Sequence, residues 1–180
     1  MIVVVMGLSG SGKSFLASIL HQDFGFEWLR SDLIRKELAG INPYESAKSG
    51  YGEGIYSQEW TKRVYEEMIK RAKEKVSQGK RVVLDATFLQ EWQRKMVKDN
   101  FPNAIFLLAY TEEQVVIKRL KERQDISDAD LEVYLRQKEN FVPPPYAIRV
   151  DTNKTRNELR AVLQEILQGF ERKDTQENAL

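Results

Sequence analysis

The stretch that decides the fold is MIVVVMGLSGSGKS, residues 1–14. Residues 1–6 form a short apolar run rich in β-branched side chains, which is typical of a strand buried in a parallel sheet. The glycine-rich segment that follows turns the chain, and residues 13–22 have the pattern of a helix. A buried strand, a glycine-rich turn and a helix in this order are the setting of a phosphate-binding loop.

Residues 7–14, GLSGSGKS, match the pattern G-x-x-x-x-G-K-[ST] at every position. Small residues let successive backbone N–H groups converge on phosphate oxygens, and the helix N-terminus adds partial positive charge. We expect Lys13 to reach the β- and γ-phosphates and the Ser14 hydroxyl to bind Mg²⁺. A chance glycine-rich turn is the alternative, but its place between strand and helix makes chance rare. The residues expected to bind the nucleotide are Gly7, Ser9, Gly10, Ser11, Gly12, Lys13, Ser14 and Phe15.

The composition fits a globular protein that can bury a core, with 180 residues, 42% of them apolar and 31% charged. The absence of cysteine excludes disulfides, thiolate metal sites and cysteine nucleophiles. No apolar run has the roughly 18 residues of a membrane span, and no basic region precedes residues 1–6. We therefore expect a cytoplasmic protein. A net charge of +1 argues mildly against a nucleic-acid partner, because such proteins usually carry a basic excess.

The rest of the chain alternates between strand and helix patterns. Further strands are expected at residues 26–29, 81–85, 104–110 and 147–151. Helix starts are expected at N-cap or capping-box residues Ser31, Thr87, Thr111, Ser127 and Thr155, with the last helix ending near Phe170. A further long helix is expected from Ser57 to about Ser77. This alternation predicts a doubly wound α/β sheet of about five parallel strands. We expect one domain, residues 1–172, and a frayed tail, residues 173–180.

Two missing motifs argue against a regulatory GTPase. Guanine recognition typically uses N-K-x-D, and the nearest string, residues 153–156, has Arg156 in place of the aspartate. The third strand ends in DATF, residues 85–88, without a D-x-x-G switch. These absences argue against GTP as the nucleotide.

The order of several motifs resembles one family. The motifs are GLSGSGKS (7–14), RSDLIRK with LAG (30–40), VVLDATFL (82–89) with Arg94, RLKER (119–123) and SDAD (127–130). Together they resemble the AAA-type P-loop kinase-like family. The chain is similar to the kinase domain of phage polynucleotide kinase, and more distantly to zeta toxins, chloramphenicol phosphotransferase and gluconate kinase. The resemblance covers about residues 1–155. It implies a three-layer, nucleoside-kinase-like P-loop NTPase fold with strand order 2-3-1-4-5, and ATP with Mg²⁺ as cofactors.

The implied strand order gives two carboxylates different tasks. The third strand lies beside the first, so Asp85 is expected near the phosphate loop, where it holds Mg²⁺, through a water in the leading interpretation. Asp32 follows the second strand and faces the acceptor side. By the D-x-x-R resemblance to phage polynucleotide kinase, Asp32 acts as general base and Arg35 binds the acceptor. The alternatives are a surface ion pair for Asp32 and Arg35 and a helix cap for Asp85.

Arg119 and Arg123 are four residues apart and share one face of a helix. By analogy with kinases of this fold, Arg119 stacks on adenine and Arg123 stabilises charge on the transferring phosphoryl group. The alternative is a solvated basic face. Residues 124–128 are expected to exclude water before transfer, and residues 151–155 to border the adenine.

Other residues have open interpretations. Arg94 either enters the acceptor site or belongs to a basic surface. Trp28 and Trp60 are expected in the core, and His21 is expected to be structural. Candidates for the acceptor pocket, with turn or packing roles as the alternative, are Tyr44, Tyr51 and Tyr56.

The sequence predicts an ATP- and Mg²⁺-dependent phosphotransferase that acts on a hydroxyl group. A small-molecule acceptor is the leading hypothesis. A polynucleotide 5′-hydroxyl is the second, and a sugar nucleotide, as for a zeta-like toxin, is the third. The hypothesis from another class is an ATP-binding regulatory module with slow hydrolysis and no acceptor. The residues expected to act in transfer are Lys13, Asp32, Arg35 and Arg123.

Overall fold

The chain folds around one parallel sheet with the strand order β2-β3-β1-β4-β5. The structure is a computed structural model that describes residues 1–42, 54, 57–123 and 128–179. Its strands are β1 (Ile2–Met6), β2 (Glu27–Arg30), β3 (Val82–Asp85), β4 (Ile105–Tyr110) and β5 (Ile148–Asp151). The predicted α/β class and the implied strand order are confirmed. The predictions for residues 124–127 and for Tyr44, Tyr51 and Tyr56 lie outside the described residues.

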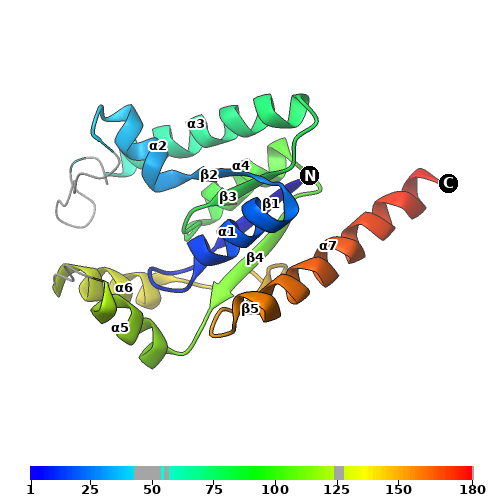
Figure 1. Ribbon diagram of the computed structural model, residues 1–180. Coiled ribbons are helices and arrows are strands. Elements are labelled where there is room, and N and C mark those ends of the chain that lie inside the picture. Colours follow the sequence, from blue (N-terminus) through cyan, green and yellow to red (C-terminus); the bar gives the residue numbers. More distant parts are fainter. Residues whose placement is uncertain (43–53, 55–56, 124–127, 180) are drawn as a thin grey trace.

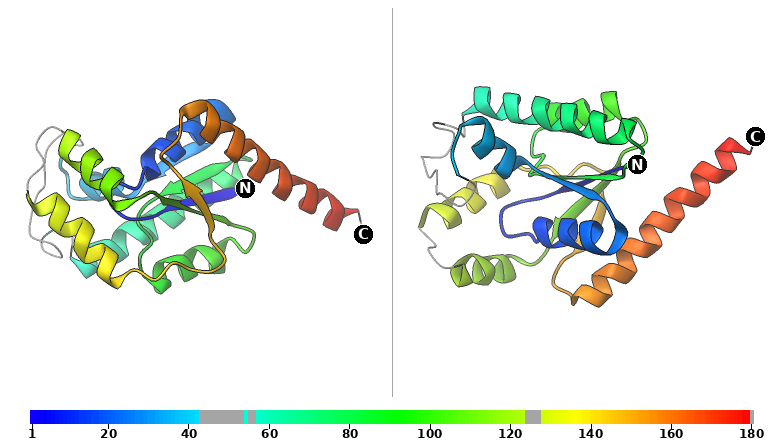
Figure 2. Two further views of the ribbon diagram at one scale, coloured as in Figure 1. Left: turned by 90° about the horizontal axis from the view of Figure 1, so that it is seen from below. Right: turned by 45° about the horizontal axis from the view of Figure 1, so that its top comes forward.

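Helices cover both faces of the sheet, which gives three layers (Figure 1). The helices are α1 (Lys13–Phe24), α2 (Ser31–Leu38), α3 (Gln58–Ser77), α4 (Glu91–Asn100), α5 (Glu113–Glu122), α6 (Asp128–Asn140) and α7 (Arg156–Asn178). α3 and α4 lie over one face, and α1 and α7 over the other. α5 and α6 lie next to each other beyond the carboxyl ends of the strands (Figure 2).

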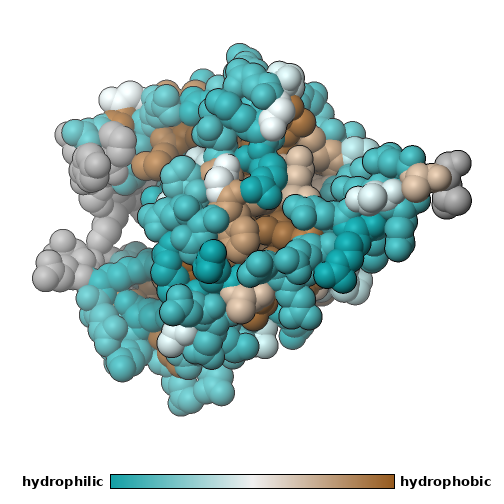
Figure 3. All heavy atoms as spheres, turned by 45° about the vertical axis from the view of Figure 1, so that its right-hand side comes forward, coloured by the Kyte–Doolittle hydropathy of each residue, from teal (hydrophilic) through white to brown (hydrophobic). Residues whose placement is uncertain are grey.

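The alternation of side chains along β1 divides the core into two clusters. Val4 and Met6 pack toward α3 and α4, while Val3 and Val5 pack toward α1 and α7. Because both faces are covered, every residue of β1 is buried, which explains why its sequence is a continuous apolar run. The face seen in Figure 3 is mostly hydrophilic, with smaller hydrophobic areas near its middle.

Several helix starts differ from the predicted caps. β2 runs through Arg30 directly into α2, so Ser31 is the first helical residue and not the cap. α5 begins after Glu112 and not at a Thr111 cap. The prediction of Ser127 as a cap lies outside the described residues.

The predicted cap at Thr87 is also wrong. Phe88, the next residue, has a left-handed backbone with φ of 48°, so the chain cannot begin a helix there. α4 starts instead after Gln90, whose side chain forms a capping box with Gln93. The predicted cap at Thr155 is confirmed by its capping box with Glu158.

The closing helix is longer than predicted. α7 continues to Asn178, past the predicted end near Phe170, and its last turns project beyond the sheet (Figures 1 and 2). Residues 171–179 are exposed. The single domain of residues 1–172 stays a prediction. Among the described helices, none combines the length and the apolar character that a membrane crossing needs.

Candidate active site

The phosphate loop joins β1 to α1 at the carboxyl ends of the central strands, where ligands bind in open α/β sheets. Gly12 precedes α1 with φ of 92°, a left-handed conformation that favours glycine. A Cβ atom at Gly12 would lie 2.6 Å from Oγ1 of Thr152, so a larger residue than glycine would also collide with Thr152. The loop therefore packs directly against the chain that follows β5.

Lys13 bends back over the loop that it follows. Its Nζ donates a 2.9 Å hydrogen bond to the carbonyl oxygen of Leu8. Burial lowers the pKa of the Lys13 ammonium group, while the charges of Asp85 and Asp32 oppose that shift. Both carboxylates therefore act on the lysine that the motif assigns to the phosphates.

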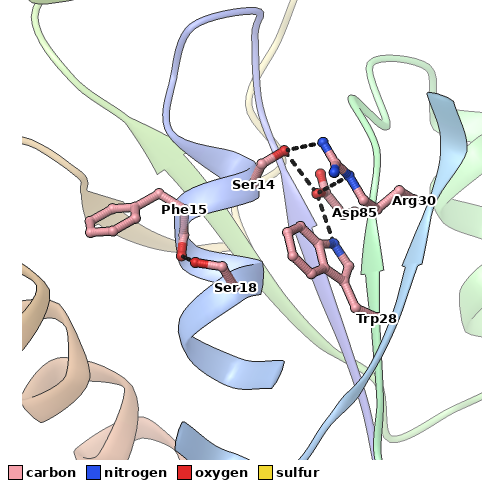
Figure 4. Close-up of polar contacts among 6 residues, drawn as sticks. All are labelled: Ser14, Phe15, Ser18, Trp28, Arg30 and Asp85. Atoms are coloured by element: carbon pink, nitrogen blue, oxygen red, sulfur yellow. Dashed lines mark hydrogen bonds and ion pairs between the residues drawn. The ribbon is translucent and has the colours of Figure 1, made fainter. Parts of the chain in front are cut away.

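Asp85 ends β3 and accepts hydrogen bonds from side chains of α1 and β2 (Figure 4). Its Oδ2 lies 3.0 Å from Oγ of Ser14, which donates to it, and 3.0 Å from Nε1 of Trp28, which also donates. Nε of Arg30 is 3.8 Å from the same oxygen. Arg30 also donates a 3.4 Å hydrogen bond to Ser14 Oγ, so the four side chains form one network.

The Asp85 carboxylate is only 5% exposed. Burial raises its pKa, and the nearby Lys13, Trp28, Ser14 and Arg30 oppose this effect. The alternative role as a helix cap does not fit, because α4 begins only after Gln90.

Ser14 and Asp85 fit a magnesium site. Mg²⁺ prefers oxygen ligands and commonly binds through one or two protein groups together with phosphate oxygens and waters. A hydroxyl and a carboxylate in direct contact next to the phosphate loop supply such a pair. In the part of the chain that the structure describes, no group of three or more His, Cys, Asp or Glu could hold a metal without further ligands.

Sequence reasoning missed the contribution of β2. Trp28, predicted to lie in the core, is half-buried and packs against the core, and its indole N–H also donates a hydrogen bond to Asp85. Arg30 lies opposite Asp85 in the register of β2 and β3, and its guanidinium stacks 4.7 Å from the Trp28 ring centre. The opposite charges of Arg30 and Asp85 at the ends of their strands could have indicated this contact. They could be paired only once the two strands were known to be neighbours.

A cavity of about 620 Å³ opens beside the phosphate loop, a size typical of small-molecule sites. It is lined by Gly10, Gly12, Lys13, Ser14, Phe15, Arg119, Arg123, Thr152, Asn153, Lys154, Thr155 and Glu158. The structure thus brings the two predicted arginines and the predicted border after β5 to one space. Phe15 is part of this lining and points away from the Asp85 network (Figure 4).

Arg119 fastens the cavity wall to the loop. It donates to the Thr152 carbonyl oxygen and to Thr152 Oγ1, both at 3.0 Å, and to the Gly10 carbonyl oxygen at 3.3 Å. Thr152 is 1% exposed, and its hydroxyl donates to the carbonyl of Ser11. The sequence predicted that Thr152 borders the adenine of the nucleotide but gave no indication of this contact with the phosphate loop.

The two residues predicted to act on the acceptor, Asp32 and Arg35, both lie on α2. Asp32 is exposed in the first turn of α2. Arg35 is only 7% exposed and donates a 3.2 Å hydrogen bond to Oγ1 of Thr61 on α3. A surface ion pair would require an exposed arginine, so the burial of Arg35 argues against that alternative.

The loop after β3 is fixed by two buried side chains, one from α3 and one from α4. The N–H of Phe88 donates to the hydroxyl of Tyr65 at 3.1 Å, and Arg94 donates to the Phe88 carbonyl oxygen at 2.7 Å. Arg94 is buried, so it anchors this loop and is not part of a basic surface. Strained backbone such as that of Phe88 tends to occur at functional sites.

A family model described as an AAA domain matches residues 2–144. The chain belongs to this AAA domain family. The match includes the phosphate loop, the end of β3 and both predicted arginines. Arg119 lies on α5, but Arg123 follows the end of that helix with extended backbone, so the prediction that the two arginines share one helix face is wrong. No curated protein shows significant similarity to this AAA domain.

Solved structures confirm that this AAA domain has the fold of P-loop kinases. A sugar kinase from Janibacter sp. HTCC2649 is 22% identical, with a TM-score of 0.64 over 93% of this chain and 94% of that one. A gluconokinase from Sinorhizobium meliloti 1021 is 22% identical, with a TM-score of 0.61 over 94% and 91%. An APS kinase from Mycobacterium tuberculosis, in complex with AMPPNP and APS, is 16% identical with a TM-score of 0.66 over 93% and 96%.

Proposed function

We propose that this AAA domain is a kinase that transfers the γ-phosphoryl group of ATP to a hydroxyl group of a small molecule. The observation that carries the proposal is the contact between Ser14 and Asp85 beside Lys13, with Asp32 near enough for its charge to act on that lysine. A nucleotide-binding loop, a candidate metal pair and a further carboxylate on the acceptor side are the parts that phosphoryl transfer needs.

The donor half of the site binds the nucleotide. The loop amides and Lys13 bind the phosphates, and Arg119 and Arg123 contact the nucleotide from the cavity wall. Ser14 and Asp85 would hold Mg²⁺, which neutralises phosphate charge when bound. Arg123, which lines the same cavity, stabilises the charge that develops on the transferring group.

The acceptor half supplies a base. Asp32 accepts the proton of the acceptor hydroxyl while that oxygen forms a bond to the γ-phosphorus. The bond between the γ-phosphorus and the β–γ bridging oxygen breaks, and ADP leaves. Arg35, buried between α2 and α3, binds or orients the acceptor.

A small molecule is favoured as the acceptor over a polynucleotide. Two of the structures with this fold are described as a sugar kinase and a gluconokinase. The net charge of +1 also lacks the excess of positive charge that polynucleotide binding usually requires.

The proposal is tested with γ-labelled ATP, Mg²⁺ and a pool of small metabolites, with a 5′-hydroxyl oligonucleotide in a parallel reaction. Label on a metabolite supports the proposal and identifies the acceptor by mass. Label on the oligonucleotide would show a polynucleotide kinase. Slow phosphate release without a labelled acceptor would show a regulatory module.

The role of Asp32 is tested with Asp32→Asn. We expect kcat for transfer to fall at least 100-fold, within the usual contribution of general base catalysis, while ADP affinity changes less than about twofold. The matched control is Asp174→Asn on the exposed end of α7, which should change neither value. An unchanged kcat in Asp32→Asn would exclude Asp32 as the base.

A further inference from the structure

Three successive residues at the tip of the phosphate loop contact the pair of helices α5 and α6, which we call the α5–α6 unit (Glu113–Glu122 and Asp128–Asn140). The first contact is apolar. Leu8 packs against a small core cluster that is separate from the two clusters of the sheet. The members of that cluster are Val116, Leu120 and Tyr134, with Leu131 packed against it.

The third residue of the tip, Gly10, lies directly against α5. A Cβ atom at Gly10 would be 2.9 Å from Cγ1 of Val116, and its carbonyl oxygen accepts the 3.3 Å hydrogen bond from Arg119. The backbone of the loop therefore lies in contact with this unit as well as with α1.

The middle residue makes a polar contact. The backbone N–H of Ser9 donates a 3.0 Å hydrogen bond to Oε1 of Gln137, which lies 128 positions further along the chain on α6. Gln137 is only 8% exposed. It lies one helical turn after Tyr134, so the same face of α6 supports Leu8 through packing and Ser9 through a hydrogen bond.

This contact determines how the Ser9 peptide is oriented. A phosphate loop binds its ligand through backbone N–H groups whose directions depend on the rotation of each peptide plane. An amide carbonyl fixes one such plane without bringing negative charge next to the phosphates, which a carboxylate at this position would do. Binding costs less free energy when the loop is already ordered in its bound form.

We propose that Gln137 is a positioning residue of the nucleotide site, which fixes the Ser9 peptide and thereby pre-organises the phosphate loop. The inference rests on the proposed function only in that the loop binds ATP and ADP. Gln137 acts through Ser9 and does not take part in the transfer step. Its loss therefore weakens the binding of substrate and transition state equally, which raises KM and leaves kcat unchanged.

The direct test is amide hydrogen exchange at Ser9, measured by NMR in the ligand-free protein, with Gln137→Met as the variant. Methionine has a similar length and no comparable acceptor. We expect exchange at Ser9 to become at least tenfold faster. We also expect the ADP dissociation constant, measured by calorimetry, and the KM for ATP to rise about fivefold, the effect of losing one hydrogen bond, with kcat within twofold.

Two further variants separate the hydrogen bond from packing. Gln137→Glu keeps an acceptor for the Ser9 N–H, so exchange at Ser9 should stay slow, whereas the added negative charge should weaken ADP binding. Gln164→Met on the exposed face of α7 makes the same chemical change away from the loop and should alter neither measurement.

Unchanged exchange at Ser9 in Gln137→Met, or unchanged or tighter ADP binding, would overturn the proposal. If Gln137→Met does not fold, the glutamate variant decides: fast exchange at Ser9 in a folded Gln137→Glu would also overturn it. Failure of the kinase function has a different signature. In that case wild-type protein labels no acceptor, while the exchange and ADP measurements still support the role of Gln137.

Discussion

The Ser14 hydroxyl donates a 3.0 Å hydrogen bond to Oδ2 of Asp85, which lies 71 positions further along the chain. This bond joins the start of α1 to the end of β3, two neighbouring points at the carboxyl edge of the sheet. Both candidate metal ligands are therefore placed by the backbone fold. This placement buries the Asp85 carboxylate, which costs folding free energy while the group is charged.

Asp85→Asn should stabilise the ligand-free protein and abolish transfer. Because burial raises the pKa of Asp85 above its unfolded value, the ionised group destabilises the fold at neutral pH. We expect Tm at pH 7 to rise by about 2–4 °C, the shift that 1 kcal/mol produces in a domain of this size. The stability associated with neutral Asp85 is complete below the unfolded pKa of about 4 and is lost as pH rises through the folded pKa. The gain should therefore vanish near pH 4 in thermal denaturation. A lower Tm at pH 7 would show that the polar contacts of Asp85 outweigh its burial.

Arg30→Met should destabilise the protein only while Asp85 is charged. Arg30 lies 3.8 Å from Asp85 and its side chain is 37% exposed, so solvent screening reduces the interaction to about 0.5–1 kcal/mol. A double-mutant cycle with Asp85→Asn, measured by urea denaturation at pH 7, should give a coupling energy of this size. A coupling energy of zero would mean that Arg30 stabilises the protein through Trp28 and Ser14 and not through Asp85.

Lys13→Met should weaken ADP binding and raise the Tm of the ligand-free protein. Loss of charged hydrogen bonds to phosphate predicts a dissociation constant about 10 to 150 times higher in calorimetry. Burial lowers the pKa of Lys13, so the folded state disfavours its charged form and removal of that charge is stabilising at pH 7. The control is Lys121→Met on the exposed surface of α5, which should change ADP affinity less than about twofold. Equal affinities in Lys13→Met and the control would exclude contact between Lys13 and the phosphates.

Gly12→Ala and Gly79→Ala separate backbone strain from crowding. Both glycines have left-handed backbones, with φ of 92° and 77°. A Cβ at Gly12 would lie 2.6 Å from Thr152 Oγ1, whereas one at Gly79 would have no neighbour within 4 Å. We expect Gly79→Ala to cost about 1–2 kcal/mol of unfolding free energy and to bind ADP normally. Gly12→Ala should cost about 1–3 kcal/mol more and lose ADP binding. If urea denaturation gives similar losses of unfolding free energy in both variants, the Thr152 side chain moves away from the added methyl group without a loss of stability.

Tyr65→Phe should reduce stability because it leaves the buried Phe88 N–H without its hydroxyl acceptor. The expected loss is about 1–3 kcal/mol in urea denaturation. The control is Tyr146→Phe at an exposed tyrosine, where the loss should stay below about 0.5 kcal/mol. A loss in Tyr65→Phe no larger than in the control would show that the strained Phe88 backbone relaxes to find another partner.

The sequence predicted those parts of the fold that local patterns determine. Residues 1–14 indicated a buried strand and a phosphate loop because apolar continuity and glycine spacing are local properties. The strand order came only from the family resemblance. Helix starts were less certain: Thr87 and Gln90 can both cap a helix, and the left-handed backbone of Phe88 decides between them.

The partners of the site residues were harder to predict, because distance along the chain carries no signal for them. The contact of Arg30 with Asp85 can be predicted only once β2 and β3 are known to be neighbours. The contact of Thr152 with Ser11 likewise depends on the packing of the phosphate loop against the chain after β5. Gln137 lies in a polar helix pattern that offers no reason to distinguish it from its neighbours. Such contacts become visible only when the elements are placed in space.

The central position of β1 also determines the order in which the chain can become native. β1 precedes all its neighbours in sequence, yet its partners β3 and β4 begin only at Val82 and Ile105. Pairing across such separations is slow, and until it happens five apolar residues with free strand edges are exposed to other chains. The site at the end of β1 comes together only when those distant strands dock, so a nucleotide selects the completed fold and increases its population by mass action.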